Sequence, residues 1–238
     1  MVTVLEKVRE TILDILFPAL CLACGKTLEG AEKAAFICRA CVAAIPVSVT
    51  LTCPRCGSRL AENIKTCHQD TPFRLAAASR YDDPRVKKLI WELKYGRKVG
   101  AAYPIASIIE THLGHLTVNL ANYLLVPMPL HPSRERERGF NQSEIIAKRL
   151  AERTNLKLAS GALTRVKRTL PQAEAKNRED RRVNVAGSFA VVKPELISGK
   201  NILLLDDVFT SGATMGEAAR TLRAAGAKRI IATVAARA

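Results

Sequence analysis

Apolar and polar positions change their period part-way along the chain. From Leu75 onward, short apolar runs alternate with longer amphipathic stretches. The apolar runs predict buried strands and the amphipathic stretches predict helices. The pattern predicts strands over 121–127, 201–205 and 229–235, and helices over 86–93, 141–154 and 215–225. Strands that alternate with helices are typical of a parallel sheet covered by helices on both faces, so the expected fold class is α/β.

The first nineteen residues have a helical period of their own. Val4, Val8, Ile12 and Leu16 recur at helical spacing, and Pro18 ends the pattern. Acidic residues interrupt the apolar positions, which is unlike a signal peptide, so we expect the protein to stay in the cytoplasm. We expect an amphipathic helix over 1–19 that docks on its own protein. The alternative, a helix on a membrane surface, would be expected to carry a more basic polar face.

Length and charge add a division between the two ends of the chain. The 238 residues suggest one sizeable domain and a smaller one, and no apolar run is long enough for a membrane span. The net charge is +15, from 37 basic and 22 acidic residues. Residues 1–80 hold 10 basic and 7 acidic residues (+3), which leaves 27 and 15 (+12) for residues 81–238. Such a surplus points to nucleic acid or phosphorylated ligands.

Cysteine is confined to one short part of the chain. All seven cysteines lie between Cys21 and Cys67, and six of them form three Cys-x2-Cys pairs. This spacing aims two thiolates at one tetrahedral ion and is typical of zinc ribbons. A reducing compartment argues against disulfides. We therefore expect a zinc-ribbon domain over 20–72, in which metal replaces a core that so short a segment can hardly build.

The cysteines divide into two expected metal sites. The sequential choice for the first site is Cys21, Cys24, Cys38 and Cys41. The second site has three cysteines and one of two possible fourth ligands: Cys53, Cys56 and Cys67, with His68 or Asp70. Two alternatives stay open. The second ribbon could fold without metal, or the first and third Cys-x2-Cys pairs could share one ion.

The end of the strand at 201–205 carries the candidate ligand site. Two carboxylates, Asp206 and Asp207, precede a small, hydroxyl-rich turn that opens a helix: Thr210, Ser211, Gly212, Ala213 and Thr214. Backbone amides at a helix start, together with these hydroxyls, can hold a phosphate. Acids beside a phosphate site would repel a simple anion. They fit a ligand that also offers cis hydroxyls, such as a ribose 5-phosphate.

Residues 203–214 closely resemble the thirteen-residue motif of type I phosphoribosyltransferases, which bind phosphoribosyl pyrophosphate (PRPP) with magnesium. The resemblance implies that Asp206 and Asp207 contact the ribose hydroxyls and that Thr210 to Thr214 hold the 5-phosphate. Further segments are similar to the ComF/GntX group, whose members carry a cysteine-rich ribbon before a phosphoribosyltransferase domain. They are 126–131, 138–143, Leu163, Arg165, Thr169, Gln172 and 182–185. The resemblance implies a transferase domain over 73–238.

Other residues complete the expected site. Pro127 and Pro129 bracket a strand end, where a rigid turn could expose backbone amides to pyrophosphate. Arg138 is the candidate catalytic cation, whereas Arg134 and Arg136 alternate with glutamates and are expected on a solvated face. The segment 165–182 corresponds to the loop that closes over pyrophosphate in the resembled fold. The basic residues 94–98 are expected in solvent at the end of the helix over 86–93. In the alternative, Trp91 beside these basic residues could stack on a base, although so few aromatic residues indicate no stacking platform. His112 and His115 are expected on the surface.

Three functions fit these patterns. The chain could be an enzyme that displaces pyrophosphate from PRPP with an amine, although no side chain of the motif is an obvious nucleophile. It could instead handle nucleic acid, since the ComF resemblance implies uptake of single-stranded DNA during natural transformation, or DNA utilisation. A zinc-dependent interaction module that docks on a DNA-uptake helicase is the third possibility. The expected ligands are zinc, PRPP or another ribose 5-phosphate with magnesium, and single-stranded DNA.

Overall fold

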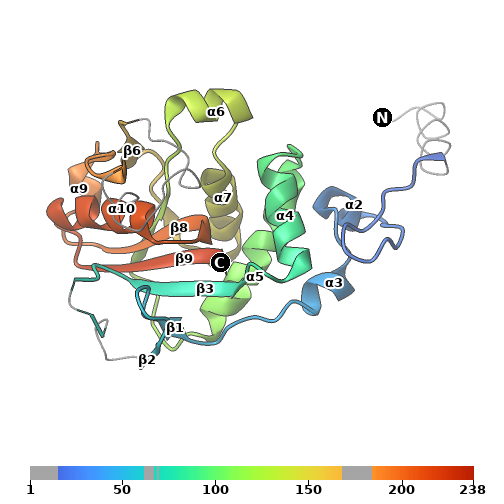
Figure 1. The fold of residues 1–238 in the computed structure, drawn as a ribbon, viewed down its shortest axis with the longest axis horizontal. Helices are drawn as coiled ribbons and strands as arrows, with labels where there is room; N and C mark the ends of the chain where they lie inside the picture. Colours follow the sequence, from blue (N-terminus) through green and yellow to red (C-terminus); the bar gives the residue numbers. More distant parts are fainter. Residues whose placement is uncertain (1–15, 62–66, 69, 168–183) are drawn as a thin grey trace.

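Five parallel strands form the centre of the protein in this computed structural model, which describes residues 16–61, 67–68, 70–167 and 184–238 (Figure 1). Across the sheet they are β3 (Arg74–Arg80), β9 (Arg229–Arg237), β8 (Asn201–Phe209), β4 (Tyr123–Pro127) and β5 (Lys157–Leu158). Two short strands, β6 (Leu163–Arg165) and β7 (Phe189–Val191), form a separate antiparallel ribbon. The expected α/β fold class is therefore correct.

Helices cover both faces of this sheet, as the alternating pattern predicts. One face packs against α4 (Pro84–Lys94), α5 (Ala102–His115) and α7 (Gln142–Thr154), and the other against α9 (Pro194–Ile197) and α10 (Ala213–Ala224) (Figure 1). The short helix η1 (Val99–Ala101) joins α4 to α5, and α6 (Pro132–Arg138) follows β4. The three layers explain why the strands read as continuous apolar runs.

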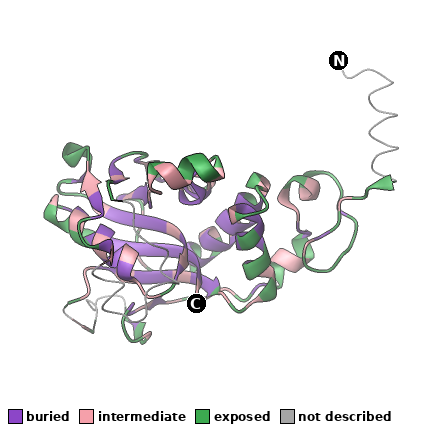
Figure 2. Cartoon of the chain, turned by 45° about the horizontal axis from the view of Figure 1, so that its top comes forward, coloured by how far each residue is buried: buried purple, intermediate pink, exposed green. Residues whose placement is uncertain are grey.

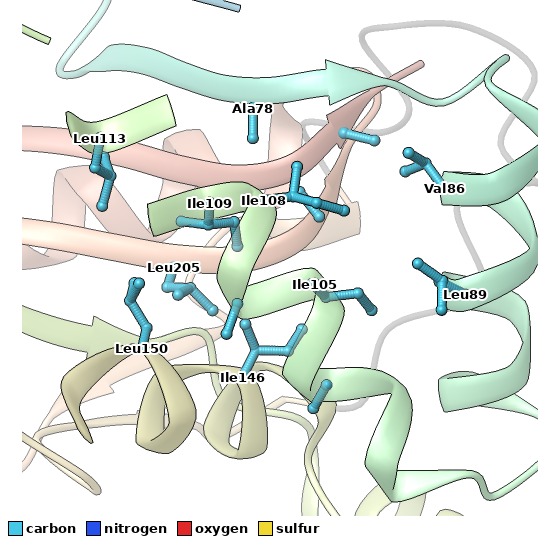
Figure 3. Close-up of a cluster of buried hydrophobic side chains, with 14 of the residues drawn as sticks. Ala78, Val86, Leu89, Ile105, Ile108, Ile109, Leu113, Ile146, Leu150 and Leu205 are labelled. Atoms are coloured by element: carbon cyan, nitrogen blue, oxygen red, sulfur yellow. The ribbon is translucent and has the colours of Figure 1, made fainter. Parts of the chain in front are cut away.

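Alternate residues of β8 pack into different layers. Leu203 and Leu205 pack in the cluster formed with α5 and α7, whereas Ile202 and Leu204 pack in the cluster on the α10 side. All four side chains are fully buried. Figure 2 shows the central strands as the most buried part of the molecule, and Figure 3 shows the cluster around Leu205 between the sheet, α5 and α7. The sheet region is thus held together mainly by hydrocarbon burial.

The cysteine-rich segment contacts this sheet region at two separate places. Its first part, with α2 (Ala31–Ala35) and α3 (Arg39–Ala43), lies beside α4 and α5 (Figure 1). Its second part forms a hairpin of β1 (Leu51–Thr52) and β2 (Arg59–Leu60). Strand β1 pairs antiparallel with β3, so the hairpin extends the edge of the central sheet.

Two helix starts follow the sequence closely. Asp83 caps α4, where its side chain accepts hydrogen bonds from the backbone amides of Arg85 and Val86. Asn141 caps α7 and accepts a hydrogen bond from the backbone amide of Ser143. Such caps satisfy backbone donors that have no partner inside the helix. They set the orientation of the two helices whose ends border the site described below.

The two histidines of α5 differ in burial. His112 is wrongly expected on the surface: it is fully buried on α5, its Nδ1 lies 2.6 Å from the Ser48 carbonyl oxygen, and burial lowers its pKa. His115, by contrast, is exposed.

The expected helix over 1–19 falls mostly in 1–15, outside the described residues. None of the described helices has the length and apolar character needed to cross a bilayer.

Candidate functional site

The two acidic residues lie at the carboxyl end of the central strand β8. Asp206 accepts a hydrogen bond from the Ser143 hydroxyl at 2.8 Å and another from the backbone amide of Asp207 at 2.9 Å. Burial, followed by the negative charge of Asp207, raises the pKa of Asp206 to about 6. The side chain of Asp206 is therefore poised to gain or lose a proton near neutral pH.

Lys94, the last residue of α4, balances this negative charge. Its Nζ lies 2.8 Å from Oδ1 of Asp207, and both side chains are largely buried. Burial disfavours the ammonium form, but the charge of Asp207 prevails and raises the pKa of Lys94 above its ordinary value. The expectation that the basic residues after α4 lie in solvent is therefore wrong for Lys94. The sequence carries no signal for this pair, because Lys94 and Asp207 meet only when α4 docks beside β8.

The turn after β8 has the conformation expected of a phosphate-binding loop. Gly212 precedes α10 with a φ of 76°, a left-handed conformation that favours glycine. A Cβ at this position would lie 2.7 Å from the Phe209 ring, so no larger residue fits. The backbone amide of Ala213, the first residue of α10, donates to Oγ of Ser211 at 3.4 Å, and amides at a helix start favour an anion.

These residues line one wall of a cleft of about 1130 Å³. Thr210, Gly212 and Thr214 line it, whereas Ser211 and Ala213 face a smaller cavity of about 220 Å³ between the turn and the second ribbon. Pro129 lines the cleft, but Pro127 is buried inside β4 and does not. The structure thus gathers most of the expected ligand-binding residues in one place.

Several basic residues line the same cleft. They are Arg134, Arg138 and Arg165, together with Lys94 at the end of α4 and Arg97 just beyond it, and Glu137 is an acidic residue among them. The guanidinium of Arg138 donates to Oε1 of Gln142 at 3.1 Å. Burial, and then the charge of Arg134, lowers the pKa of Arg165. Arg134 was expected on a solvated face with Arg136, yet only Arg136 is exposed and away from the cleft. Most of the segment 165–182, which is expected to close over pyrophosphate, lies outside the described residues.

The cysteines come together in two clusters that follow the sequential order. The first consists of Cys21, Cys24, Cys38 and Cys41, and the second of Cys53, Cys56, Cys67 and His68. Within each cluster, the potential ligand atoms lie within 4.8 Å of one another. A tetrahedral zinc ion with Zn–S bonds of about 2.3 Å needs sulfur atoms about 3.8 Å apart. Cys24 and Cys38 are 3.9 Å apart and Cys56 and Cys67 are 3.4 Å apart, so both clusters fit zinc.

The second cluster distinguishes between the two candidates for its fourth ligand. Nδ1 of His68 lies 3.5 Å from Sγ of Cys53 and 3.3 Å from Sγ of Cys67. Asp70 instead forms an ion pair with Arg55 at 2.8 Å. Hydrogen bonds with Ser58 lower the pKa of Cys56 to about 6, which favours the thiolate form that zinc binds. The arrangement offers three cysteine sulfur atoms and one imidazole nitrogen, and neither cluster mixes the first and third cysteine pairs.

Comparison with known proteins agrees with this division. A double zinc ribbon domain matches residues 12–70, and a phosphoribosyl transferase domain matches residues 138–238. The DNA utilization protein YhgH of Salmonella typhimurium is 30% identical over 221 residues, which cover 90% of this chain and 94% of that protein. The chain belongs to the ComF/GntX family. Zinc-binding ribbons and a phosphoribosyltransferase domain are therefore properties of this ComF/GntX protein.

More distant relatives extend the ComF/GntX assignment. Competence protein F of Haemophilus influenzae is 25% identical over 189 residues, which cover 75% of this chain and 81% of that protein. Among solved structures, phosphoribosylpyrophosphate synthetase from Mycobacterium smegmatis gives a TM-score of 0.32 at 20% identity, over 55% of this chain and 33% of that chain. The fold assignment rests on the sheet order and the matched domains rather than on this weak likeness.

Proposed function

We propose that the cleft binds PRPP, or another ribose 5-phosphate, and that the protein acts on single-stranded DNA during its uptake or utilisation. One observation carries the ligand proposal: a carboxylate pair, a turn of the phosphate-binding type and three arginines line a single cleft. Asp206 and Asp207 would accept from the ribose hydroxyls, and the turn from Thr210 to Thr214 would hold the 5-phosphate. The arginines of the cleft would face the pyrophosphate.

Magnesium fits the same pocket through its chemistry. Hard oxygen ligands are what magnesium prefers, and it is often held by phosphate oxygens together with one or two carboxylates. Asp206 and Asp207 are the carboxylates that could assist, with Lys94 already present as a neutralising charge. Bound magnesium would supply charge stabilisation at the pyrophosphate. Arg134, Arg138 and Arg165 would add positive charge around the same group.

We propose that the cleft binds its ligand, with turnover as the alternative. Among the described residues that line the cleft there is no cysteine or histidine to serve as a nucleophile or a base. An amine acceptor would have to bring its own nucleophile, as the alternative of an active phosphoribosyltransferase requires. Arg138 would then stabilise charge that develops on the leaving pyrophosphate.

The DNA part of the proposal rests on charge and on the names of relatives. The two relatives described above are named a DNA utilization protein and a competence protein. Residues 81–238 carry a surplus of 12 positive charges, given by 27 basic minus 15 acidic residues, and this surplus suits a polyanion. We place the protein in the cytoplasm, where thiols stay reduced, with a ribbon domain over 20–72 and a transferase domain over 73–238.

Calorimetry with PRPP and magnesium tests the ligand proposal. The double variant Asp206→Asn, Asp207→Asn should lose detectable binding, because the ribose hydroxyls lose their charged acceptors. A matched control, Glu152→Gln with Glu195→Gln, removes two exposed carboxylates away from the cleft and should bind normally. Equal affinity of the two double variants would refute the assignment.

A separate measurement tests the DNA proposal. Binding of labelled oligo(dT) to the wild-type protein should weaken steeply as salt rises, because phosphate contacts release counterions. Failure to retain single-stranded DNA at low salt would refute this part and leave the PRPP proposal intact.

A further inference from the structure

The outward face of α4 presents two large aromatic side chains. Trp91 is 50% exposed and Tyr95 is 62% exposed, although both rings are large enough to contribute to a core. They lie four residues apart, on one side of the helix, and their ring centroids are 5.9 Å apart with planes inclined at 49°. Core packing does not explain the pair, since the buried face of α4 is formed by Val86, Leu89, Ile90 and Leu93.

Basic groups flank both rings. Nζ of Lys88 lies 6.0 Å from the Trp91 ring, and the guanidinium carbon of Arg138 lies 5.5 Å from the Tyr95 ring. The acidic residue of this part of α4, Glu92, has its side chain mostly buried and ion-paired with Lys88 and Lys98. The aromatic face is therefore bordered by positive charge. Such a surface suits a polyanion better than an uncharged apolar partner.

The aromatic face runs into the cleft described above. Tyr95 and Arg138 both line that cleft, and Arg97 lines it just beyond Tyr95. A ligand that covers Trp91 and Tyr95 could thus continue toward the arginines that line the cleft. This continuity distinguishes the pair from an isolated exposed aromatic residue, of which Tyr103 on α5 is an example: it is 43% exposed, carries Arg149 over its ring and does not line the cleft.

We propose that Trp91 and Tyr95 form a base-stacking platform for single-stranded DNA at the entrance of the cleft. Bases stack on aromatic side chains whatever their sequence, and basic groups beside the rings hold the backbone. The rings are 5.9 Å apart, whereas neighbouring bases along one strand of a duplex are 3.4 Å apart. Two adjacent bases can occupy both rings only in an unstacked, flexible strand, so the platform selects single-stranded over duplex DNA. The inference depends on the DNA part of the proposed function.

Fluorescence offers a direct test, because Trp91 is the single tryptophan of the chain. Saturating oligo(dT) should quench its emission, whereas a duplex of equal length should quench it much less. In anisotropy titrations, Trp91→Ala with Tyr95→Ala should weaken oligo(dT) binding about 100-fold, given about tenfold for each ring. The slope of affinity against salt should not change, because the phosphate contacts remain.

Two further variants separate stacking from charge. Lys88→Ala should weaken binding and reduce the salt slope by about 0.7, the value for one phosphate contact on a single strand. Tyr103→Ala is the matched aromatic control and should bind like the wild type, and Trp91→Phe should retain most of the affinity lost in Trp91→Ala. Unfolding temperatures of all variants show whether each is folded.

The outcomes distinguish this inference from the proposal beneath it. If wild-type protein binds oligo(dT) but the double aromatic variant binds equally well, the platform is refuted and the DNA proposal stands. The platform is also refuted, and the DNA proposal stands, if anisotropy rises while Trp91 emission is unchanged. Equal affinity for duplex and single-stranded DNA would have the same consequence. If the wild type binds no single-stranded DNA at low salt, both the platform and the DNA proposal are refuted.

Discussion

The zinc ribbons and the sheet region are stabilised in different ways. In the ribbons, two groups of four potential metal ligands connect short segments of chain, and only a handful of apolar side chains are buried beside them: Leu28, Ile37, Ile45, Leu51 and Leu60. In the sheet region, strands β8 and β9 are buried on both faces between two layers of helices (Figure 2). Metal coordination thus replaces hydrocarbon burial where the chain is too short to form a core.

Removal of zinc should unfold the ribbons and leave the sheet region folded. A strong chelator removes a coordination energy of about 10 kcal/mol or more for each ion, which a ribbon cannot replace. Hydrogen exchange followed by mass spectrometry should show loss of protection over 20–60 and retained protection in β4, β8 and β9.

Addition of zinc to the treated protein should restore protection in the ribbons. The edge strand β3 is informative here, because β1 pairs with it at Thr52 and Leu75. Exchange at β3 should rise moderately after chelation. Simultaneous unfolding of ribbons and sheet would contradict the contrast and show a single cooperative unit.

A matched pair of leucine truncations compares the two regions directly. Leu203 in β8 and Leu28 in the first ribbon are both fully buried. Leu203→Ala should lower the free energy of unfolding by about 3 kcal/mol, within the range for buried leucine. Leu28→Ala should lower it less in zinc-saturated protein, by about 2 kcal/mol at the low end of that range, because fewer apolar side chains surround Leu28. Urea unfolding followed by the fluorescence of Trp91, together with zinc release, measures both; equal losses would contradict the contrast.

Lys94 and Asp207 form a largely buried ion pair in the sheet region, where most other buried side chains are apolar. Lys94→Met removes the partner of Asp207 and should destabilise the protein by about 2 kcal/mol at pH 7. The loss should shrink toward pH 5, because Asp206, whose pKa is raised to about 6, then takes up a proton and less uncompensated negative charge is buried. Urea unfolding at the two pH values measures this. Lys87→Met, at an exposed position of the same helix, is the control, and a pH-independent loss would argue against the ion pair as its cause.

The smallest effect concerns the proton on Asp206, whose pKa is raised to about 6 by burial and by Asp207. Because the folded state binds this proton more tightly than the unfolded chain does, its contribution to stability is full below about pH 4 and is lost as the pH rises through 6. If the proposed site binds PRPP through the Asp206 carboxylate, the affinity should fall about fivefold from pH 6 to pH 5, because the ionised fraction falls by that factor. Calorimetry on the wild type and on Asp206→Asn separates this step from titration of the ligand. Identical pH profiles would contradict the assignment to Asp206.

The sequence predicts much of the sheet region because its elements are long and strongly patterned. The strand expected over 201–205 is the beginning of β8, and the helix expected over 141–154 is α7 with its cap. The strand continues further than expected, so both aspartates lie inside it. Apolar periodicity ends where the charged residues begin, whereas backbone pairing with β9 continues to Phe209.

Other features depend on contacts between distant segments, which one sequence does not reveal. Lys94 lies far from Asp207 in the chain, and an amphipathic helix that ends in lysine looks the same whether that lysine meets solvent or a carboxylate. His112 is buried because the segment at Ser48 crosses α5. The pairing of β1 with β3 involves strands too short to give a periodic signal.

The position of β9 bears on how the protein folds as it is made. This strand comes last among the described strands along the chain, yet it lies between β3 and β8 in the middle of the sheet. A nascent chain on the ribosome can bind zinc and form its ribbons early, whereas β3 and β8 must wait for β9 before they can be joined. Until then, their apolar faces are exposed to chaperones and to aggregation. The ribbons can therefore fold early in synthesis, whereas the central sheet is complete only when β9 has emerged from the ribosome.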